Sequence, residues 1–207
     1  MSVSLIPPAE AVMDILNKTG AYRRGHFVYP NGKHASHYFQ MPLAFRLYDN
    51  AKILSVGLSR LFRMEKSIAK VLPKVSIVSP SPAGILVAFG VREALSAEQL
   101  YWAEIEADGK RHFRQYVEDY PMNPAIIVDD INRSGKAISE TVGLVKALGV
   151  EVIGIGTIAK FDDAPTEFDG IQAKSLLSFD VNFYGTADEW KSSRSATDDA
   201  EEESVRF

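Results

Sequence analysis

The stretch AIIVDDINRSGKAISETVGLVKALG, residues 125–149, decides the fold. It begins with a continuous apolar run that ends in two aspartates, as buried strands of parallel sheets do. A short loop over residues 131–135 follows. The next segment stops at Gly149 and carries apolar residues at helical spacing, namely Ile138, Val142, Val145 and Leu148. This order of strand, loop and helix predicts one βα unit of a parallel sheet.

The segments on either side of this unit repeat the alternation. Apolar, β-prone runs predict strands, and Pro82 opens a segment of helical character. We therefore expect strands over residues 75–79, 99–105, 112–118 and 151–161, and a helix over 83–96. The predicted fold class is α/β, with a mostly parallel central sheet flanked by helices.

The N-terminal part has a different pattern. Residues 7–19 predict a helix that Gly20 ends. The pair Asn31-Gly32 separates two β-prone runs and predicts a hairpin, so we expect a small hairpin or hood region at about residues 20–45. A second helix is expected over residues 50–64, with Asp49 as its N-cap. Its apolar face is predicted to carry Ile53, Val56, Leu61 and Met64.

Length and composition favour one domain over residues 1–185. The last stretch, residues 186–207, is acidic, polar and poor in aliphatic side chains. This composition predicts a disordered tail. A short docked helix is the alternative.

The bulk composition narrows the classes of function. The 207 residues contain no cysteine, carry a net charge of −4 and include no run of 18 apolar residues. We therefore expect no disulfide, no membrane span and no nucleic-acid partner. The N-terminus lacks the basic region and apolar stretch of a signal peptide, and a cytoplasmic location is expected.

The loop after the two aspartates has the properties of an anion site. A helix start behind a glycine-containing loop offers free N–H groups and the positive end of the helix dipole. Asp129 and Asp130 can accept hydrogen bonds from neighbouring sugar hydroxyls. Together these groups suit a ribose 5-phosphate. A purely structural interpretation, in which the aspartates end the strand and cap the helix, stays open. The loop is neither GxxxxGK[ST] nor GxGxxG, so a nucleotide-binding oxidoreductase is disfavoured.

The chain resembles the type I phosphoribosyltransferases, which use phosphoribosyl diphosphate (PRPP). An apolar strand, two acids, two further residues and a Ser-Gly phosphate loop are similar to the PRPP signature of that family. The segments GHFVYPNGKHASHYFQ, VSPSPAGILVAFGVREAL and WAEIEADGKRHFRQYVED are similar, in the same order, to the hairpin, diphosphate loop and flap of the orotate branch. The resemblance covers roughly residues 20 to 160 and implies the type I phosphoribosyltransferase fold.

The resemblance also implies a set of site residues. Asp129 and Asp130 would hold the ribose hydroxyls. The 5-phosphate would lie on Arg133, Ser134, Gly135, Lys136 and Ala137. The diphosphate side would consist of Ser81, Pro82, Ala83 and Gly84, and the base would contact Tyr38, Phe39 and Ser139. The flap would include Glu104, Arg111 and Arg114, with Lys110 as the catalytic cation. Ser139 stands where the family often has an arginine that binds the carboxylate of orotate.

The reaction that the resemblance implies is the transfer of ribose 5-phosphate from PRPP to orotate or a related pyrimidine, with release of diphosphate. Magnesium would be bound mainly by the substrate, with Asp129 as the candidate protein ligand. A homodimer is expected, and small molecules are the expected ligands. The altered phosphate loop and the lysine-poor flap leave one alternative, a non-catalytic sensor of PRPP or a nucleotide with the same fold.

Overall fold

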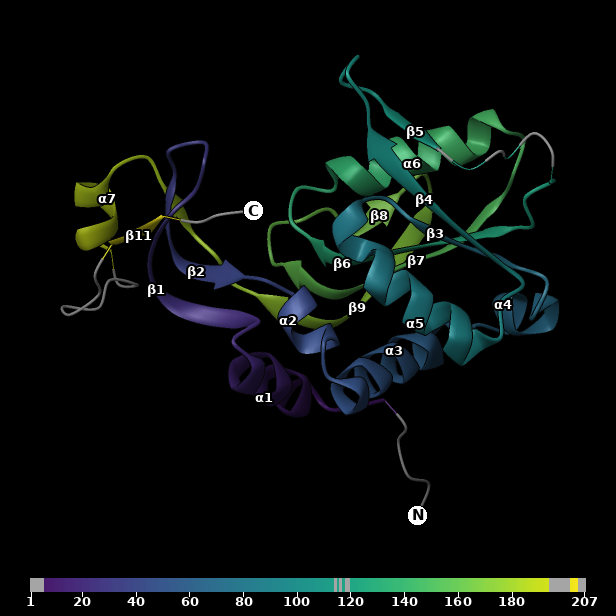
Figure 1. Cartoon of the computed structure of the whole chain (residues 1–207), viewed down its shortest axis with the longest axis horizontal. Coiled ribbons are helices and arrows are strands. Elements are labelled where there is room, and N and C mark those ends of the chain that lie inside the picture. The colour runs from purple at the N-terminus through teal and green to yellow at the C-terminus, as the bar shows by residue number, and fades with distance from the viewer. Residues whose placement is uncertain (1–5, 114, 116, 118–119, 194–201, 205–207) are drawn as a thin grey trace.

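The predicted βα unit is present at the centre of the molecule. Strand β6 (Ala125–Asn132) leads through a short loop into helix α6 (Lys136–Ala147). The computed structural model of the chain, shown in Figure 1, describes residues 6–113, 115, 117, 120–193 and 202–204.

Strand β6 belongs to a seven-stranded sheet with the order β5-β4-β3-β6-β7-β9-β8. The five inner strands are parallel, and each edge strand is antiparallel to its neighbour. The strands other than β6 are β3 (Ser76–Ser79), β4 (Gln99–Ile105), β5 (Arg111–Phe113), β7 (Val152–Phe161), β8 (Glu167–Phe168) and β9 (Ile171–Phe179). The predicted α/β class is therefore confirmed. The strand expected over 112–118 is wrong at residues 115 and 117, which form a bend and a turn, while 114, 116 and 118 lie outside the described residues.

Helices cover both faces of this sheet. Helix α6 packs on one face against β6 and β7. The other face carries α1 (Ala9–Thr19), α3 (Tyr48–Arg63) and α5 (Ile85–Leu95), which follows the 3₁₀ turn η1 (Pro82–Gly84). Two short helices, α2 (Pro42–Phe45) and α4 (Lys66–Val71), flank α3. None of the helices in the described part of the chain has the length and apolar character that crossing a membrane requires.

Helix α3 buries a different face from the one expected. Leu54, Leu58 and Phe62 are buried, whereas Ile53 is 44% and Met64 71% exposed. The helix also begins earlier, after Leu47, so Asp49 lies in its first turn and is not the N-cap. The buried face fits because β7 has glycines beneath it. A Cβ at position 156 would lie 2.6 Å from the Phe62 ring.

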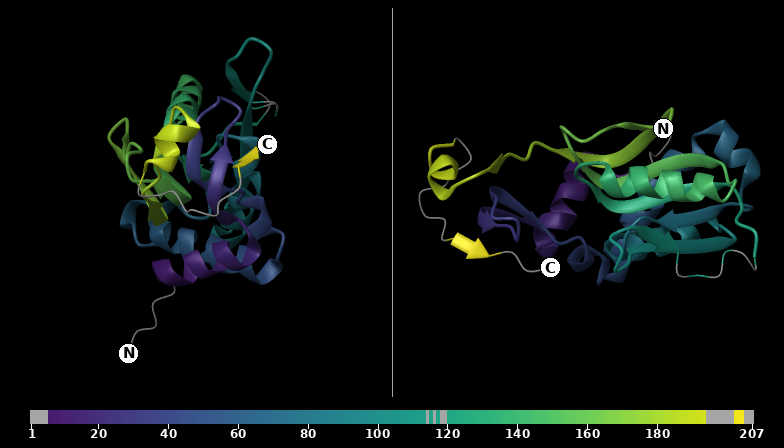
Figure 2. Two further views of the ribbon diagram at one scale, coloured as in Figure 1. Left: turned by 90° about the vertical axis from the view of Figure 1, so that its left-hand side faces the viewer. Right: turned by 90° about the horizontal axis from the view of Figure 1, so that it is seen from above.

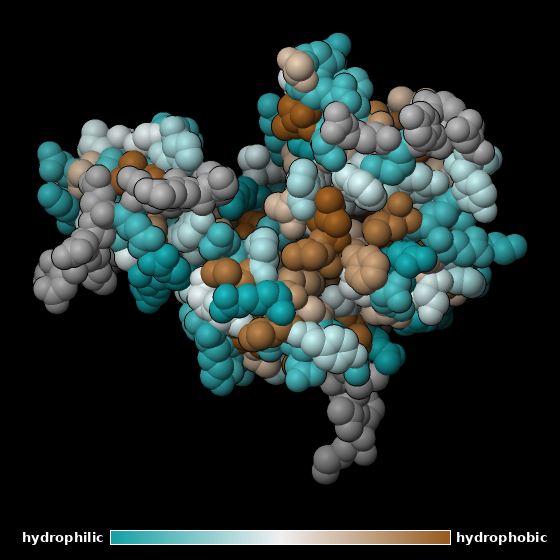
Figure 3. Space-filling model, viewed as in Figure 1, coloured by the Kyte–Doolittle hydropathy of each residue, from teal (hydrophilic) through white to brown (hydrophobic). Residues whose placement is uncertain are grey.

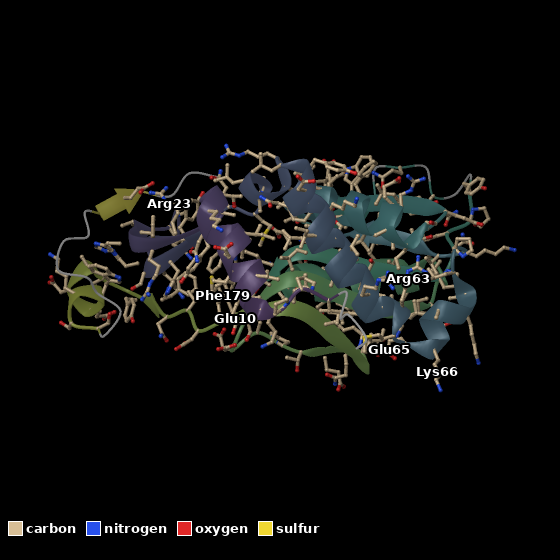
Figure 4. The ribbon with its side chains drawn as sticks, turned by 90° about the horizontal axis from the view of Figure 1, so that it is seen from below. Glu10, Arg23, Arg63, Glu65, Lys66 and Phe179 are labelled. Atoms are coloured by element: carbon tan, nitrogen blue, oxygen red, sulfur yellow. The ribbon has the colours of Figure 1, made fainter. Side chains whose placement is uncertain are left out.

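The predicted hairpin is present and forms part of a second sheet. Strands β1 (Tyr22–Val28) and β2 (His34–Phe39) pair in antiparallel fashion around the Asn31-Gly32 turn. Two C-terminal strands, β10 (Phe183–Tyr184) and β11 (Glu202–Ser204), extend this hood sheet to the order β10-β2-β1-β11. Figure 2 shows the hood sheet at one end of the molecule, beyond the main sheet. Arg23 lies beside β11 and forms an ion pair with Glu203 at 2.5 Å (Figure 4).

The expectation of a disordered tail from residue 186 is wrong for the residues that the structure describes there. Helix α7 (Ala187–Lys191) begins at Thr186, whose side chain accepts a hydrogen bond from the Glu189 N–H, while the Glu189 carboxylate accepts one from Gly185. Trp190 is 2% exposed, stacks on His26 at 3.8 Å between ring centroids and donates to Ser36. The alternative of a docked short helix is the one observed, because this tryptophan supplies the apolar anchor. Residues 194–201 and 205–207 lie outside the described part.

Candidate active site

One cavity collects most of the residues that the sequence singles out. It has a volume of about 320 Å³ and lies where β3 and β6, neighbours in the sheet, give way to their loops. The chain changes direction between these strands, since β4 follows β3 on one side and β6 lies on the other. Ligands of open α/β sheets bind at such points. The cavity is lined by Ser81, Ala83, Asp129, Asp130, Ile131, Asn132, Arg133, Ser134, Gly135, Lys136, Ala137 and Ile138.

The two aspartates at the end of β6 have different environments. Asp129 is 5% exposed and accepts hydrogen bonds from the Ser81 hydroxyl at 3.1 Å and the Asp130 N–H at 3.0 Å. Burial raises the pKa of Asp129 well above its usual range, and the neighbouring charge of Asp130 raises it further. Burial also raises the pKa of Asp130, but the Ile131 N–H and the Arg133 charge oppose that rise. Asp129 is therefore the carboxyl group that retains a proton more readily.

The loop over residues 131–135 rests on the segment between β7 and β9. Gly135 has a φ of 74°, and a Cβ there would lie 2.9 Å from the Phe168 ring and 3.0 Å from Pro165. Asn132 is 3% exposed and donates to the Pro165 carbonyl at 2.8 Å. Among the described residues, no side chain caps the start of α6. Its first N–H groups are therefore oriented to receive an anion.

The loop after β3 forms the second wall. Ser79 donates to the Ser81 carbonyl at 2.7 Å, and the Ser81 hydroxyl accepts from the Gly84 N–H at 3.3 Å. Gly84 packs closely beneath Asp129, since a Cβ there would lie 2.3 Å from its Oδ1 atom. Ser81 and Ala83 line the cavity, whereas Pro82 points to solvent and Gly84 acts as a buried spacer.

Several predicted site residues lie away from this cavity. Tyr38 and Phe39 are only 6% and 3% exposed, because both rings pack among other aromatic side chains of the hood and core. Ser139 is exposed and does not line the cavity. None of these three residues lines the cavity, and their contact with a base stays a prediction.

The flap residues are also separated from the cavity. The hairpin between β4 and β5 projects from the body (Figure 1), and Lys110 is exposed in its turn. Glu104 accepts a hydrogen bond from the Trp102 indole at 3.1 Å. Arg111 is held inside the fold, as described below, and Arg114 lies outside the described residues. Lys136 lines the cavity, but its side chain is 79% exposed and its ammonium group lies 3.7 Å from the Glu140 carboxylate.

The sequence reasoning missed two residues near the cavity. Asn132, a buried polar residue at the end of β6, anchors the loop over residues 131–135 as described above, and no feature of the sequence distinguished it from its neighbours in that loop. Tyr29 of the hood is the other. Burial raises the pKa of Tyr29, and the charge of Arg133 opposes that rise, as it does at Asp130.

Comparisons with known proteins agree with this geometry. No family model matches the chain. It is 29% identical over 175 residues to the orotate phosphoribosyltransferase of Desulforamulus reducens, covering 84% of this chain and 86% of that protein. It is also 29% identical over 177 residues to the Thermotoga petrophila enzyme of the same name, covering 86% and 89%. The crystal structure of orotate phosphoribosyltransferase from Aeropyrum pernix superimposes with a TM-score of 0.66 at 19% identity, covering 81% and 93%. In sequence the chain therefore resembles orotate phosphoribosyltransferases, and it shares the fold of a solved member of that family.

Proposed function

We propose that the protein transfers ribose 5-phosphate from PRPP to orotate or a related pyrimidine and releases diphosphate. The observation that carries this proposal is the single cavity in which two carboxyl groups, an uncapped helix start and the loop after β3 meet. Sequence similarity to orotate phosphoribosyltransferases over more than four fifths of the chain supports the same reaction.

Each wall of the cavity suits one part of PRPP. The N–H groups of residues 133–137 would bind the 5-phosphate, and Asp129 and Asp130 would accept hydrogen bonds from the ribose hydroxyls. Positive charge develops on the sugar as the bond to diphosphate breaks, and a nearby carboxylate stabilises that charge. Asp130 is the better candidate for this electrostatic role, because the pKa of Asp129 is raised further.

The β4–β5 hairpin is proposed to close over the bound substrate and exclude water. Its turn is defined by hydrogen bonds from Glu106 N–H to the Lys110 carbonyl and from Gly109 N–H to the Glu106 carbonyl. Lys110 would reach the substrate only through such a closure. Because Ser139 cannot bind a carboxylate in the way an arginine does, Arg133 is the cation that we propose faces the base.

Magnesium fits this cavity only in part. Among the described residues there is no cluster of three or more histidine, aspartate or glutamate side chains able to hold a metal ion. The carboxyl groups that line the cavity are those of Asp129 and Asp130. The Oδ1 atom of Asp129 already accepts a hydrogen bond from the Ser81 hydroxyl. An ion brought in with PRPP would therefore be bound mainly by diphosphate oxygens and water, with one of these carboxylates at most. When bound, it would neutralise charge on the departing diphosphate.

The test of the proposal is a product assay with PRPP, magnesium and a panel of bases. We expect nucleotide formation with orotate and none with adenine or hypoxanthine. Uracil and cytosine, run in parallel, show whether the carboxylate of orotate is required. Tight PRPP binding without conversion of any base would instead support the non-catalytic sensor. Failure to bind PRPP at all would contradict both.

We also propose a homodimer formed through an apolar groove between α3 and α5. Figure 3 shows apolar side chains gathered on this face, and the groove has a volume of about 400 Å³. Phe89 and Leu86, which line it, are 53% and 48% exposed. Lys52 lines the α3 side and Glu93 the α5 side. A two-fold axis through the groove would bring the lysine of one copy to the glutamate of the other.

Replacing Phe89 by glutamate is expected to weaken the dimer about 100-fold, because a charge would be buried where an aromatic anchor is lost. Analytical ultracentrifugation measures the change. Leu148→Glu, at a 42% exposed leucine elsewhere, is the matched control and should leave the dimer intact. Lys52→Glu should weaken the dimer, and Glu93→Lys in the same chain should restore it. A monomeric wild-type protein, or a Phe89→Glu protein that dimerises normally, would contradict this interface.

A further inference from the structure

Arg111 connects strand β5 to two segments that line the cavity, the loop after β3 and helix α6. It lies at the start of β5, its side chain is only 7% exposed, and its guanidinium donates to the Pro80 carbonyl in the loop after β3. The same group forms an ion pair with Glu140 of α6 at 3.2 Å. Burying a cation costs free energy unless its hydrogen bonds are satisfied. The bonds to Pro80 and Glu140 therefore fix the guanidinium between the loop after β3 and helix α6.

The bond to Pro80 fixes the direction of a neighbouring donor. The Pro80–Ser81 peptide is trans, since the only cis peptide among the described residues is Leu72–Pro73. In a trans peptide the carbonyl and the next N–H point to opposite sides. With the Pro80 carbonyl held on Arg111, the Ser81 N–H is turned away from Arg111. No acceptor for this N–H exists among the residues that the structure describes.

The other groups of Ser81 are already engaged. Its carbonyl accepts from Ser79, and its hydroxyl donates to Asp129 and accepts from Gly84. The carbonyl and the hydroxyl of Ser81 therefore both have hydrogen-bond partners, and only its N–H has none among the described residues. Ser81 lines the cavity beside Asp129. A donor that is fixed in place before the ligand arrives binds an anion at little entropic cost.

We propose that Arg111 is a positioning residue for diphosphate: it holds the Pro80–Ser81 peptide so that the Ser81 N–H donates to the diphosphate group of PRPP. This inference rests on the proposed function of the cavity. Arg111 would act on the diphosphate indirectly, by orienting the loop after β3. The ribose and the 5-phosphate would be bound elsewhere, at Asp129–Ala137.

The experiment is titration calorimetry of the full chain with three ligands, namely PRPP, diphosphate and ribose 5-phosphate, each with magnesium. Arg111→Met is expected to weaken PRPP and diphosphate about 10- to 100-fold, the usual range for one hydrogen bond to a charged group. Ribose 5-phosphate, which has no diphosphate, should bind within about 2-fold of wild type, a change too small to mark a lost hydrogen bond. Arg111→Lys, which keeps one cation for Pro80, should lose less and serves if the methionine variant does not fold.

Two further variants show whether a loss of affinity comes from the bond to Pro80, from the ion pair with Glu140 or from removing any arginine that binds a backbone carbonyl. Glu140→Gln removes the ion pair but leaves the bond to Pro80, so its loss of PRPP affinity should be smaller than that of Arg111→Met. Arg63→Met removes another arginine that donates to a backbone carbonyl, that of Ala94, at 3.0 Å, and should not change binding (Figure 4). An equal loss for all three ligands, or no loss in Arg111→Met, would overturn the inference while leaving the proposed function standing. Absence of PRPP binding in the wild type would overturn both.

Discussion

Replacing Asp129 and Asp130 together by asparagine is expected to lower kcat/KM for PRPP by about 100- to 10,000-fold, because the two carboxyl groups proposed to accept from the ribose hydroxyls become neutral amides, which are weaker acceptors. Steady-state kinetics with PRPP varied at saturating orotate measure the effect. The matched control is Asp163→Asn, at an exposed aspartate outside the cavity, which should leave kcat/KM unchanged. Unaltered kinetics in the double variant would remove the aspartates from the site.

Replacing Asp129 alone by asparagine is expected to increase the stability of the folded protein. Because burial raises the pKa of Asp129 in the folded state, the protonated form favours folding. That contribution is complete below the unfolded pKa of about 3.9 and is lost as the pH rises through the folded pKa. Asparagine imitates the protonated form at every pH. Asp129→Asn alone should therefore raise the free energy of unfolding at pH 7, with the gain shrinking toward pH 3.5.

Chemical denaturation of Asp129→Asn and wild type between pH 3.5 and 8 measures this gain. The result would combine lost function with improved stability, which is a common property of binding sites. A variant that is less stable than wild type at pH 7, or a difference that does not change with pH, would show that the Asp129 carboxylate is well solvated or paired in the folded protein.

Gly135→Val is expected to weaken the binding of ribose 5-phosphate by at least 100-fold and to destabilise the fold by about 2–4 kcal/mol. Two causes act together. A φ of 74° is strained for a β-branched residue, and the new side chain would meet Phe168 and Pro165 within about 3 Å. The loop must then move off its support, and its N–H groups no longer converge on the phosphate.

Calorimetry for binding and urea denaturation for stability measure the two effects. Gly143→Ala is the matched control, since this glycine of α6 has open space around its Cβ position and no positive φ. It should bind normally and gain about 0.5–1 kcal/mol of stability from helix propensity. Normal phosphate affinity in Gly135→Val would mean that the loop does not hold the phosphate.

The main sheet was predictable because its signals are local. The apolar run 125–128, the two aspartates and the loop to Gly135 specify strand, edge and helix start without reference to distant residues. The buried face of α3 was not predictable in the same way. Apolar residues lie on two sides of that helix, and the choice between them depends on the glycines of β7, roughly 100 residues away in the sequence.

The cavity lining was predictable where one segment builds it, whereas residues from distant segments were expected beside it and lie elsewhere. Asp129, Asp130 and the loop 133–137 share one cavity, as expected. Tyr38 and Phe39 were expected at the base, but Tyr38 packs against Phe27 in the hood and Phe39 against Phe179 of β9, which is labelled in Figure 4. The C-terminal part of the chain also packs against the hood, where Trp190 stacks on His26. The Thr186-x-x-Glu189 capping pattern was the available sign that this part is ordered.

The most direct test of the account is a crystal structure of the protein with ribose 5-phosphate. The account predicts the phosphate within hydrogen-bonding distance of the N–H groups of residues 133–137, with the ribose hydroxyls on Asp129 and Asp130. A sugar phosphate bound elsewhere, or an empty cavity at a ligand concentration that saturates the protein in solution, would contradict it.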